Sequence, residues 1–295
     1  MNRRREFIQA AVATSLTAAG SSLNRSAVFG AADRDGYSAK VLRLEPLTHN
    51  VRRVRLMPLE DEFSFAPGQY VLLRAPEEYL KDFNARHQTE HKRVARPYSF
   101  ASVPSAGRAF DLIIKHYPAP PGKQNEVPPG VMSTYVHKHL KVADVVALGK
   151  PRGKLYTPTA PERPIVVVAG GVGAAPFVGL ISHWFEEQID QQREIYFFLG
   201  VRSRRDLLLH EQFSRWQAMK KRFHYIPALS HPAADDRWEG KKGYINAVLQ
   251  QHFSEKLDAE VYLAGSPVMV KFTRQVLEKL GVDEQRVHRD PIRVQ

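Results

Sequence analysis

The chain has 295 residues, of which 43% are hydrophobic and 25% are charged, and its formal net charge is +12 at pH 7. This length suits two domains that each bury a core, and the composition is that of a folded protein rather than a disordered or membrane-embedded one. The basic residues are scattered and no nucleic-acid-binding motif accompanies them. We therefore expect anionic cofactors or an acidic protein partner, and no nucleic acid.

Cysteine is absent from the sequence. Its absence excludes a cysteine-ligated iron–sulfur cluster, a disulfide and a catalytic thiol within these residues. Two histidine pairs, His87 with His91 and His137 with His139, are close in sequence but lack a third ligand at a recognisable spacing. We therefore predict no metal site.

The first residues form an arginine-rich stretch, Arg3-Arg4-Arg5-Glu6-Phe7-Ile8, followed by a mildly apolar run from Ala10 to Ala19. This run is too short and too rich in Ser and Thr for a stable membrane span. Residues 1–32 resemble a twin-arginine export signal with cleavage near Gly30 to Ala32, which predicts a periplasmic or exported protein. A disordered basic tail is the alternative, and the protein is cytoplasmic if the signal is not used.

Residues 33–157 have the pattern of a small β-barrel. Short alternating apolar runs are separated by prolines, which predicts strands near 41–44, 51–56, 70–73, 98–101, 110–117 and 145–148. These runs predict a six-stranded antiparallel β-barrel, with one short helix from Val131 to Leu140. The charged segment Glu77–Arg93 shows no clear periodicity and is predicted to be a long surface excursion, which either covers a ligand or is an insertion.

Two segments of this half carry chemistry. In Arg96-Pro97-Tyr98-Ser99 a cation, an aromatic ring and a hydroxyl lie on one extended stretch, and strand alternation puts Arg96 and Tyr98 on a face that could bind a flat anionic cofactor. In Pro128-Pro129-Gly130-Val131-Met132-Ser133-Thr134 the chain enters a helix whose free N–H groups and hydroxyls suit a phosphate. Taken singly, Tyr98 as a packing residue and Ser133-Thr134 as a helix cap remain open.

Residues 158–295 alternate strand and helix. The apolar strand Ile165–Ala169 runs into Gly170-Gly171-Val172-Gly173-Ala174-Ala175-Pro176, whose glycines would let the backbone approach a pyrophosphate and whose proline suits a first helical turn. Further strands at 194–199, 223–229 and 260–264 alternate with helices near 176–188, 206–221, 244–253 and 268–280, which predicts an α/β domain with a five-stranded parallel sheet. Gly265-Ser266-Pro267 follows a strand's carboxyl end, where such sheets bind ligands; a plain turn is the alternative.

Over residues 37–290 these motifs, together with Phe65-Ala66-Pro67-Gly68-Gln69-Tyr70, resemble the ferredoxin–NADP reductase superfamily. The resemblance implies FAD in the barrel and NADH or NADPH, as cosubstrate, in the α/β domain. Tyr98 would stack on the flavin ring, Ser99 would hydrogen-bond near flavin N5, and both would be the catalytic residues. The remaining expected cofactor-binding residues are Arg96, Pro97, Gly130, Met132, Ser133 and Thr134 for FAD, and Gly170, Gly171, Gly173, Ala174, Pro176, Arg202, Gly265, Ser266 and Pro267 for the nicotinamide nucleotide.

Within the superfamily the chain is most similar to the flavin-bearing F subunit of the sodium-pumping NADH:quinone oxidoreductase, and then to oxygenase reductases. The likeness lies in Val127-Pro128-Pro129-Gly130, in the excursion after Pro76 and in the stretch from Leu229 to Tyr244. That flavoprotein also carries a cluster domain and a membrane helix, and because we find neither motif here we do not expect membership in a sodium pump.

Three features bear on the electron donor. His231-Pro232 stands where NADPH-selective relatives usually place an arginine after the serine, which favours NADH, while Arg202, Arg204 and Arg205 keep NADPH open. Ala264 replaces the cysteine that relatives commonly place beside the reacting nicotinamide carbon. Ile292 stands where relatives have an aromatic residue that covers the flavin.

These features lead to three hypotheses of function. The leading one is an FAD-dependent oxidoreductase that passes electrons from NADH, or NADPH, through flavin to a separate one-electron carrier. A second is an exported flavoprotein with a donor other than a nicotinamide nucleotide. A third is a non-catalytic nucleotide- or partner-binding protein on the same fold.

Overall fold

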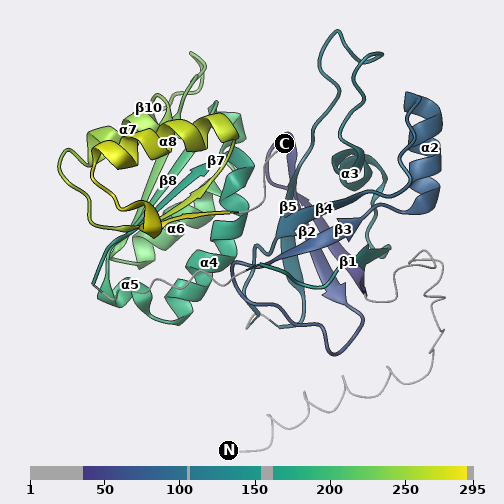
Figure 1. The fold of residues 1–295 in the computed structure, drawn as a ribbon, viewed down its shortest axis with the longest axis horizontal. Coiled ribbons are helices and arrows are strands. Elements are labelled where there is room, and N and C mark those ends of the chain that lie inside the picture. The colour runs from purple at the N-terminus through teal and green to yellow at the C-terminus, as the bar shows by residue number, and fades with distance from the viewer. Residues whose placement is uncertain (1–35, 105–106, 154–161, 291–295) are drawn as a thin grey trace, which may run out of the picture.

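The computed structural model describes residues 36–104, 107–153 and 162–290, which form two domains, each built on one sheet (Figure 1). The predicted export signal at residues 1–32, the predicted boundary between residues 157 and 158, and Ile292 lie outside these ranges. The two-domain fold predicted from the sequence, an antiparallel barrel followed by a parallel α/β domain, is confirmed.

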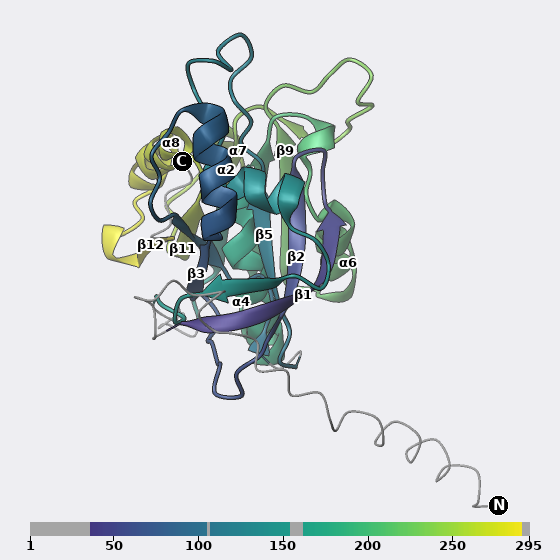
Figure 2. The same ribbon diagram turned by 90° about the vertical axis from the view of Figure 1, so that its right-hand side faces the viewer.

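The first domain is an antiparallel barrel with the strand order β4-β3-β6-β1-β2-β5 (Figure 2). Its strands are β1 (Tyr37–Pro46), β2 (Val51–Pro58), β3 (Tyr70–Arg74), β4 (Ala95–Ser99), β5 (Phe110–Lys115) and β6 (Val145–Leu148). The sheet closes between its two end strands, where Phe100 pairs with Leu112 and the Ala101 N–H donates to Asp111 O at 2.8 Å. Closure leaves an apolar interior, to which alternate residues of the strands contribute.

The helix predicted from Val131 to Leu140 begins as a single turn, α3 (Val131–Thr134), and continues as the wider π-helical turn η2 (Tyr135–His139). All four residues of α3 are buried. The element is too short to be stable by itself, so its conformation depends on what packs against it.

The predicted surface excursion from Glu77 to Arg93 is wrong for its first half, which forms helix α2 (Glu77–His87). Three apolar side chains on one side of this helix, Tyr79, Leu80 and Phe83, are buried in the barrel core. Three apolar positions among many charged ones are a weak periodic signal, and packing against the barrel rather than propensity stabilises the helix.

The second domain is a parallel sheet with the order β10-β9-β8-β7-β11-β12. Its strands are β7 (Ile165–Gly170), β8 (Ile195–Val201), β9 (Phe223–Leu229), β10 (Lys241–Lys242), β11 (Glu260–Ala264) and β12 (Val287–Arg289). This is one strand more than the five expected, of which the sequence located four; the two strands that it did not locate, β10 and β12, are edge strands of two and three residues. Strands of that length carry no recognisable alternation.

Helices cover both faces of this sheet. They are α4 (Ala175–Glu186), α5 (Ile189–Gln192), α6 (His210–Met219), α7 (Ile245–His252) and α8 (Pro267–Lys279). Buried side chains of α4 and α6 share one core, and those of α7 and α8 share another on the opposite face. The chain therefore forms three layers in this half, as a parallel sheet requires.

Helix α4 also joins the two domains, between which it lies in Figure 1. Its apolar core continues into Val51, Ala101 and Ile113 of the barrel. At Gly179 the helix approaches the barrel backbone so closely that a Cβ atom there would lie 2.7 Å from Phe100 O and 2.9 Å from Ser102 O. The domains are thus packed directly on each other rather than held by a linker alone.

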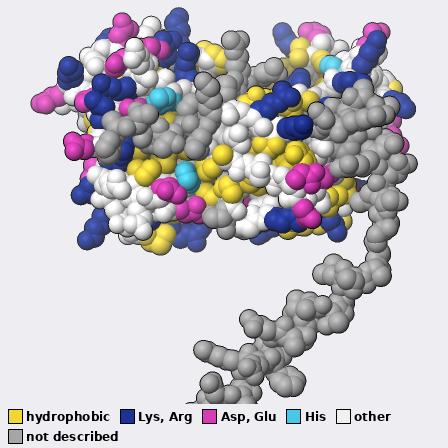
Figure 3. Space-filling model, turned by 60° about the horizontal axis from the view of Figure 1, so that its bottom comes forward, with side chains coloured by type: hydrophobic (Ala, Val, Ile, Leu, Met, Phe, Trp, Pro, Cys, Tyr) yellow, Lys and Arg dark blue, Asp and Glu magenta, His cyan; other side chains and the backbone are white. Residues whose placement is uncertain are grey.

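Lys and Arg side chains are distributed over both domains on the face drawn in Figure 3, and apolar side chains lie along its middle. Among the residues that the structure describes, none of the helices has the length and apolar character needed to cross a membrane.

We expect Gly179→Ala to lower the free energy of unfolding by about 1–3 kcal/mol, because the added methyl group must push α4 away from two backbone carbonyls. Thermal unfolding of the purified variant measures the loss. Ser182→Ala, on the same helix, removes a hydroxyl that bonds only to Val178 O within α4 and is the matched control. A Gly179→Ala variant as stable as the control would contradict the close approach.

Candidate functional site

The motif Arg96-Pro97-Tyr98-Ser99 occupies β4, as predicted, and pairs with β3. The register sets Arg96 opposite Leu73 and Tyr98 opposite Val71, so the two side chains share one face. Arg96 is exposed, Tyr98 is half-buried against the barrel core, and Ser99 is buried. Burial raises the pKa of Tyr98, which therefore stays a neutral aromatic surface at physiological pH.

The predicted phosphate cradle surrounds the turn from Gly130 into α3. A Cβ atom at Gly130 would lie 2.7 Å from Ser133 Oγ and 3.3 Å from the Tyr117 Cβ, so a larger residue would displace the Ser133 hydroxyl. The Ser133 hydroxyl donates to Gly130 O at 3.0 Å and accepts from the Tyr117 N–H at 3.1 Å. Ser133 thus holds the turn against the end of β5, and its role in binding phosphate stays a prediction.

Two further residues of the cradle are placed differently. Met132 points into the barrel core and is 2% exposed, so it can contribute only its backbone. The Thr134 Oγ1 is buried and has no hydrogen-bond partner among the described residues. A buried hydroxyl without a partner costs about 1–3 kcal/mol, and a ligand oxygen at this turn would relieve that cost. Four features together fit FAD. They are the half-buried ring of Tyr98, the exposed Arg96, the tight turn at Gly130 and the Thr134 hydroxyl, which has no hydrogen-bond partner among the described residues.

The glycine-rich loop after β7 forms a short 3₁₀ turn from Gly171 to Ala174 before α4 begins. Gly171 has φ +53°, and a Cβ atom there would meet nothing within 4 Å, so this residue faces open space in a conformation that favours glycine. Gly173 is a glycine for another reason. A Cβ atom at Gly173 would lie 2.5 Å from the backbone oxygen of Ala264. A Cβ atom at Gly170 would lie 2.5 Å from Met269 Sδ, so the Met269 side chain would have to shift.

A cleft of about 1620 Å³ opens between the two domains beside this loop. Five of the predicted nucleotide-binding residues line it: Gly170, Gly171, Arg202, Ser266 and Pro267. Gly265 lines a neighbouring cavity of about 1170 Å³ between α8 and β12, and Pro176 lies at the seam with the barrel beside Gly68. Gly173 and Ala174 are buried beneath the loop and support it.

The cleft has wall residues that the sequence analysis did not single out. Lys115, Tyr117, His49 and Asn50 come from the barrel, and Tyr244, Val268 and Phe272 come from the α/β domain. The last three are 64%, 64% and 47% exposed, which is unusual for large apolar side chains and marks an open apolar surface. Exposure cannot be inferred from periodicity, so no sequence signal identified this surface.

The two predicted sites meet at one junction. The Ser99 hydroxyl at the end of β4 donates to Asp290 Oδ2 at 3.3 Å. The Asp290 N–H in turn donates to Leu263 O, next to Ala264. Asp290 is thus a site residue that sequence reasoning missed, because 191 positions separate it from Ser99.

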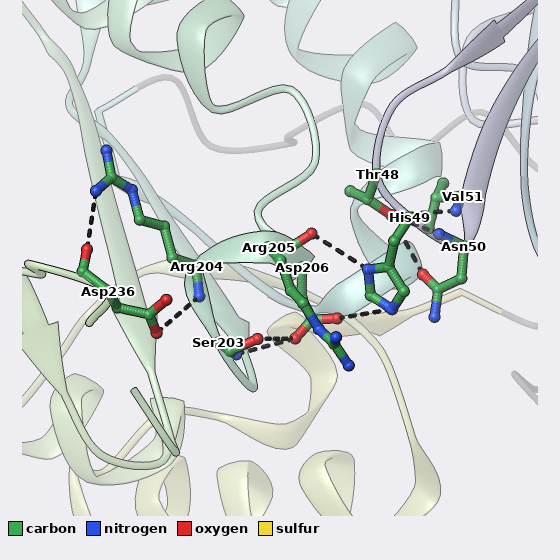
Figure 4. A network of polar contacts seen from close by, with 9 residues as sticks. All are labelled: Thr48, His49, Asn50, Val51, Ser203, Arg204, Arg205, Asp206 and Asp236. Atoms are coloured by element: carbon green, nitrogen blue, oxygen red, sulfur yellow. Dashed lines mark hydrogen bonds and ion pairs between the residues drawn. The ribbon is translucent and has the colours of Figure 1, made fainter. Parts of the chain in front are cut away.

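A polar network ties the barrel to the loops of the nucleotide cleft (Figure 4). On the turn between β1 and β2, His49 Nδ1 lies 3.4 Å from Arg205 O, and its Nε2 lies 3.8 Å from Asp206 Oδ1. Asp206 caps the turn η4 (Arg204–Asp206) by accepting from the Ser203 hydroxyl at 2.6 Å and from the Ser203 N–H at 3.0 Å. The barrel therefore helps to hold the loop after β8 in place.

The network continues to the loop after β9. The Arg204 guanidinium donates to Asp236 O at 2.8 Å, and the backbone N–H of Arg204 donates to the Asp236 carboxylate at 3.3 Å. Three arginines were compatible with NADPH as the electron donor. Of these, Arg204 is engaged within the protein, whereas Arg202 and Arg205 line the cleft. Asp235 and Asp236 line the cleft as well.

We expect Arg96→Ala to weaken FAD binding by about tenfold or more, because an exposed guanidinium contributes roughly 1.5–3 kcal/mol when it hydrogen-bonds to phosphate. The flavin content of the purified protein and titration of the apoprotein with FAD measure the change. Arg43→Ala is the control, since Arg43 is an exposed barrel arginine whose Nη2 lies 3.9 Å from Glu45 Oε2. Arg96→Ala protein with full yellow colour would contradict the assignment.

Two family models match this chain in succession. Residues 38–156 match the oxidoreductase FAD-binding domain, and residues 167–275 match the oxidoreductase NAD-binding domain. The F subunit of the Na(+)-translocating NADH-quinone reductase of Mannheimia succiniciproducens is 30% identical over 254 residues, which are 78% of this chain and 61% of that protein. The chain thus spans about three fifths of the length of such relatives.

Solved structures agree on the fold. The ferredoxin reductase in carbazole 1,9a-dioxygenase has a TM-score of 0.66 and 25% identity over 86% of this chain and 68% of that chain. The FAD/NAD-binding domain of nitric oxide dioxygenase from Vibrio cholerae has a TM-score of 0.68 and 23% identity over 87% of this chain and 98% of that chain. The chain therefore belongs to the oxidoreductases that join an FAD-binding barrel to an NAD-binding α/β domain of the ferredoxin reductase type.

Proposed function

We propose that this protein is an FAD-dependent oxidoreductase that takes electrons from NADH and passes them to a separate one-electron carrier. The observation that supports this best is the junction of Ser99 with Asp290, where the strand that carries Arg96 and Tyr98 meets the carboxyl ends of the nucleotide-binding sheet. FAD, when bound, supplies the redox chemistry, because a flavin can accept a hydride and release electrons one at a time. The residues of the protein position the two cofactors relative to each other and provide charged groups around them.

Each residue at the junction has a defined task in this proposal. Tyr98 offers a neutral ring against which a flat cofactor can lie, and Arg96 offers a cation to its phosphates. Asp290 accepts the Ser99 hydrogen bond and so orients that hydroxyl beside the expected flavin position. Ala264 is small, buried and without a thiol, so it takes no part in proton or electron transfer and leaves room at the end of β11.

The charges around the cleft support NADH rather than NADPH as donor. Arg204 is engaged by Asp236, and the carboxylates of Asp235 and Asp236 would repel the extra phosphate of NADPH. Arg202 and Arg205 remain for the pyrophosphate that both nucleotides share. Tyr244 and Phe272 offer exposed rings on which an adenine base can stack.

We expect NADH, added anaerobically to the purified flavoprotein, to bleach the flavin absorbance, and NADPH to do so far more slowly. Absorbance spectra before and after each addition measure this. Flavin bands that persist with both nucleotides would favour a different electron donor. A flavoprotein with such a donor is the second candidate function, and the alanine at position 264 is the observation that favours it. Protein that cannot be loaded with FAD would contradict the whole proposal.

We further propose that residues 1–32 direct export of the folded flavoprotein through the twin-arginine route, supported by Arg4-Arg5 and the short apolar run that follows. Replacing Arg4 and Arg5 together by lysine should keep the protein out of the periplasm while leaving its flavin content unchanged. Arg25→Lys is the control, since it lies outside the arginine pair. Fractionation of cells that express each variant measures the outcome, and equal periplasmic amounts would refute export by this route.

A further inference from the structure

The excursion between β3 and β4, which the sequence left open as a ligand cover or an insertion, is a compact unit held at both ends. At its base the Ala75 N–H donates to Val94 O at 2.9 Å. In the last turn of α2 the Asn84 side chain donates to His91 O at 2.9 Å and accepts from the Thr89 hydroxyl at 2.8 Å. A segment held in this way is suited to support another part of the protein.

The side chain of Tyr79 on helix α2 hydrogen-bonds to the predicted phosphate turn. The Tyr79 hydroxyl donates to Val131 O, the first residue of α3, at 2.8 Å in a buried position. Its ring packs against Tyr135 and His139 of η2, with ring centroids 5.0 Å away in each case. Burial raises the pKa of Tyr79 to about 12, so the hydroxyl keeps its proton and remains a donor at neutral pH. Figure 1 shows α2 beside α3.

The turn needs such support because its own hydrogen bonds are few. Helix α3 is four residues long, and the Tyr135 N–H that follows it is shared between Met132 O and Val131 O. A short turn with shared bonds that widens into a π-helix is marginal without outside contacts. Ser133 holds the turn to β5 from one side, and Tyr79 holds it to α2 from the other.

We propose that α2 is the element that positions the turn from Gly130 to Thr134 for the diphosphate of the flavin dinucleotide, and that Tyr79 is the positioning residue through which it acts. This inference rests on the proposed binding of FAD. It gives the excursion a definite place in the site, since β4, the strand that carries Arg96 and Tyr98, follows α2 after residues 88–94. Both halves of the flavin site are thus joined to one helix.

Tyr79→Phe tests the inference, because it keeps the ring and removes only the hydrogen bond. Tyr225→Phe is the matched control: Tyr225 is also buried, and its hydroxyl lies 3.2 Å from His210 Nδ1 in the other domain. Apoproteins are titrated with FAD and with riboflavin, which has the flavin ring but no phosphate, at a temperature where circular dichroism shows each variant folded.

We expect Tyr79→Phe to bind FAD about tenfold more weakly, the effect of one buried carbonyl losing its donor. Riboflavin should bind Tyr79→Phe as it binds the wild type, and Tyr225→Phe should bind both ligands as the wild type does. Unchanged FAD affinity, an equal loss for FAD and riboflavin, or an equal loss in Tyr225→Phe would each overturn the proposal. Wild-type protein that fails to bind FAD would instead refute the proposed function.

A second variant covers the case in which Tyr79→Phe does not fold. Asn84→Ala loosens the far end of α2 without touching Tyr79 or the phosphate turn. It should weaken FAD in the same direction and by a smaller factor than Tyr79→Phe, again without an effect on riboflavin. Wild-type FAD affinity in Asn84→Ala would show that the excursion does not support the turn.

Discussion

The arrangement of this protein depends on the direct contact between helix α4 and the segment that closes the barrel. Gly179 allows the helix to approach the backbone of Phe100 and Ser102, and the apolar core of the α/β domain extends across this contact into the barrel. Phe100 follows the strand that ends in Ser99, and α4 follows the glycine loop after β7. The contact between α4 and Phe100 therefore sets the distance between the two predicted cofactor sites. The flavin site lies next to Phe100, and the nucleotide site lies next to α4.

A second close approach fixes the nucleotide side. Gly173 lies against the carbonyl of Ala264, so the loop after β7 and the end of β11 are held together by contact between main chains rather than by side chains. The polar network from His49 through Asp206 to Arg204 and Asp236 then connects the remaining loops of the cleft to the barrel. The floor of the cleft is therefore tightly packed, and its rim is held by polar contacts that salt can weaken.

On the flavin side, two residues expected to bind the cofactor also make contacts within the protein, and their binding role stays a prediction. The Ser133 hydroxyl is used by the backbone of Gly130 and Tyr117, and Met132 lies in the core. The residues best placed to touch a ligand are the exposed Arg96 and the half-buried Tyr98, while the buried Thr134 hydroxyl lacks a protein partner among the described residues. A sequence motif therefore predicts where a site lies more reliably than it predicts the role of each residue in that site.

The sequence by itself determined the two-domain fold, the strand that carries Arg96 to Ser99 and the glycine loop after Ile165–Ala169, because alternation, prolines and glycine runs are local signals that survive without tertiary context. It missed α2, whose few apolar positions become meaningful only against the barrel, and the short edge strands β10 and β12. Only the tertiary structure decided that Ser99 meets Asp290, that His49 reaches Asp206 and that Tyr79 supports the phosphate turn. These pairs lie far apart in the chain, and they come together only when the barrel closes and α4 packs against it.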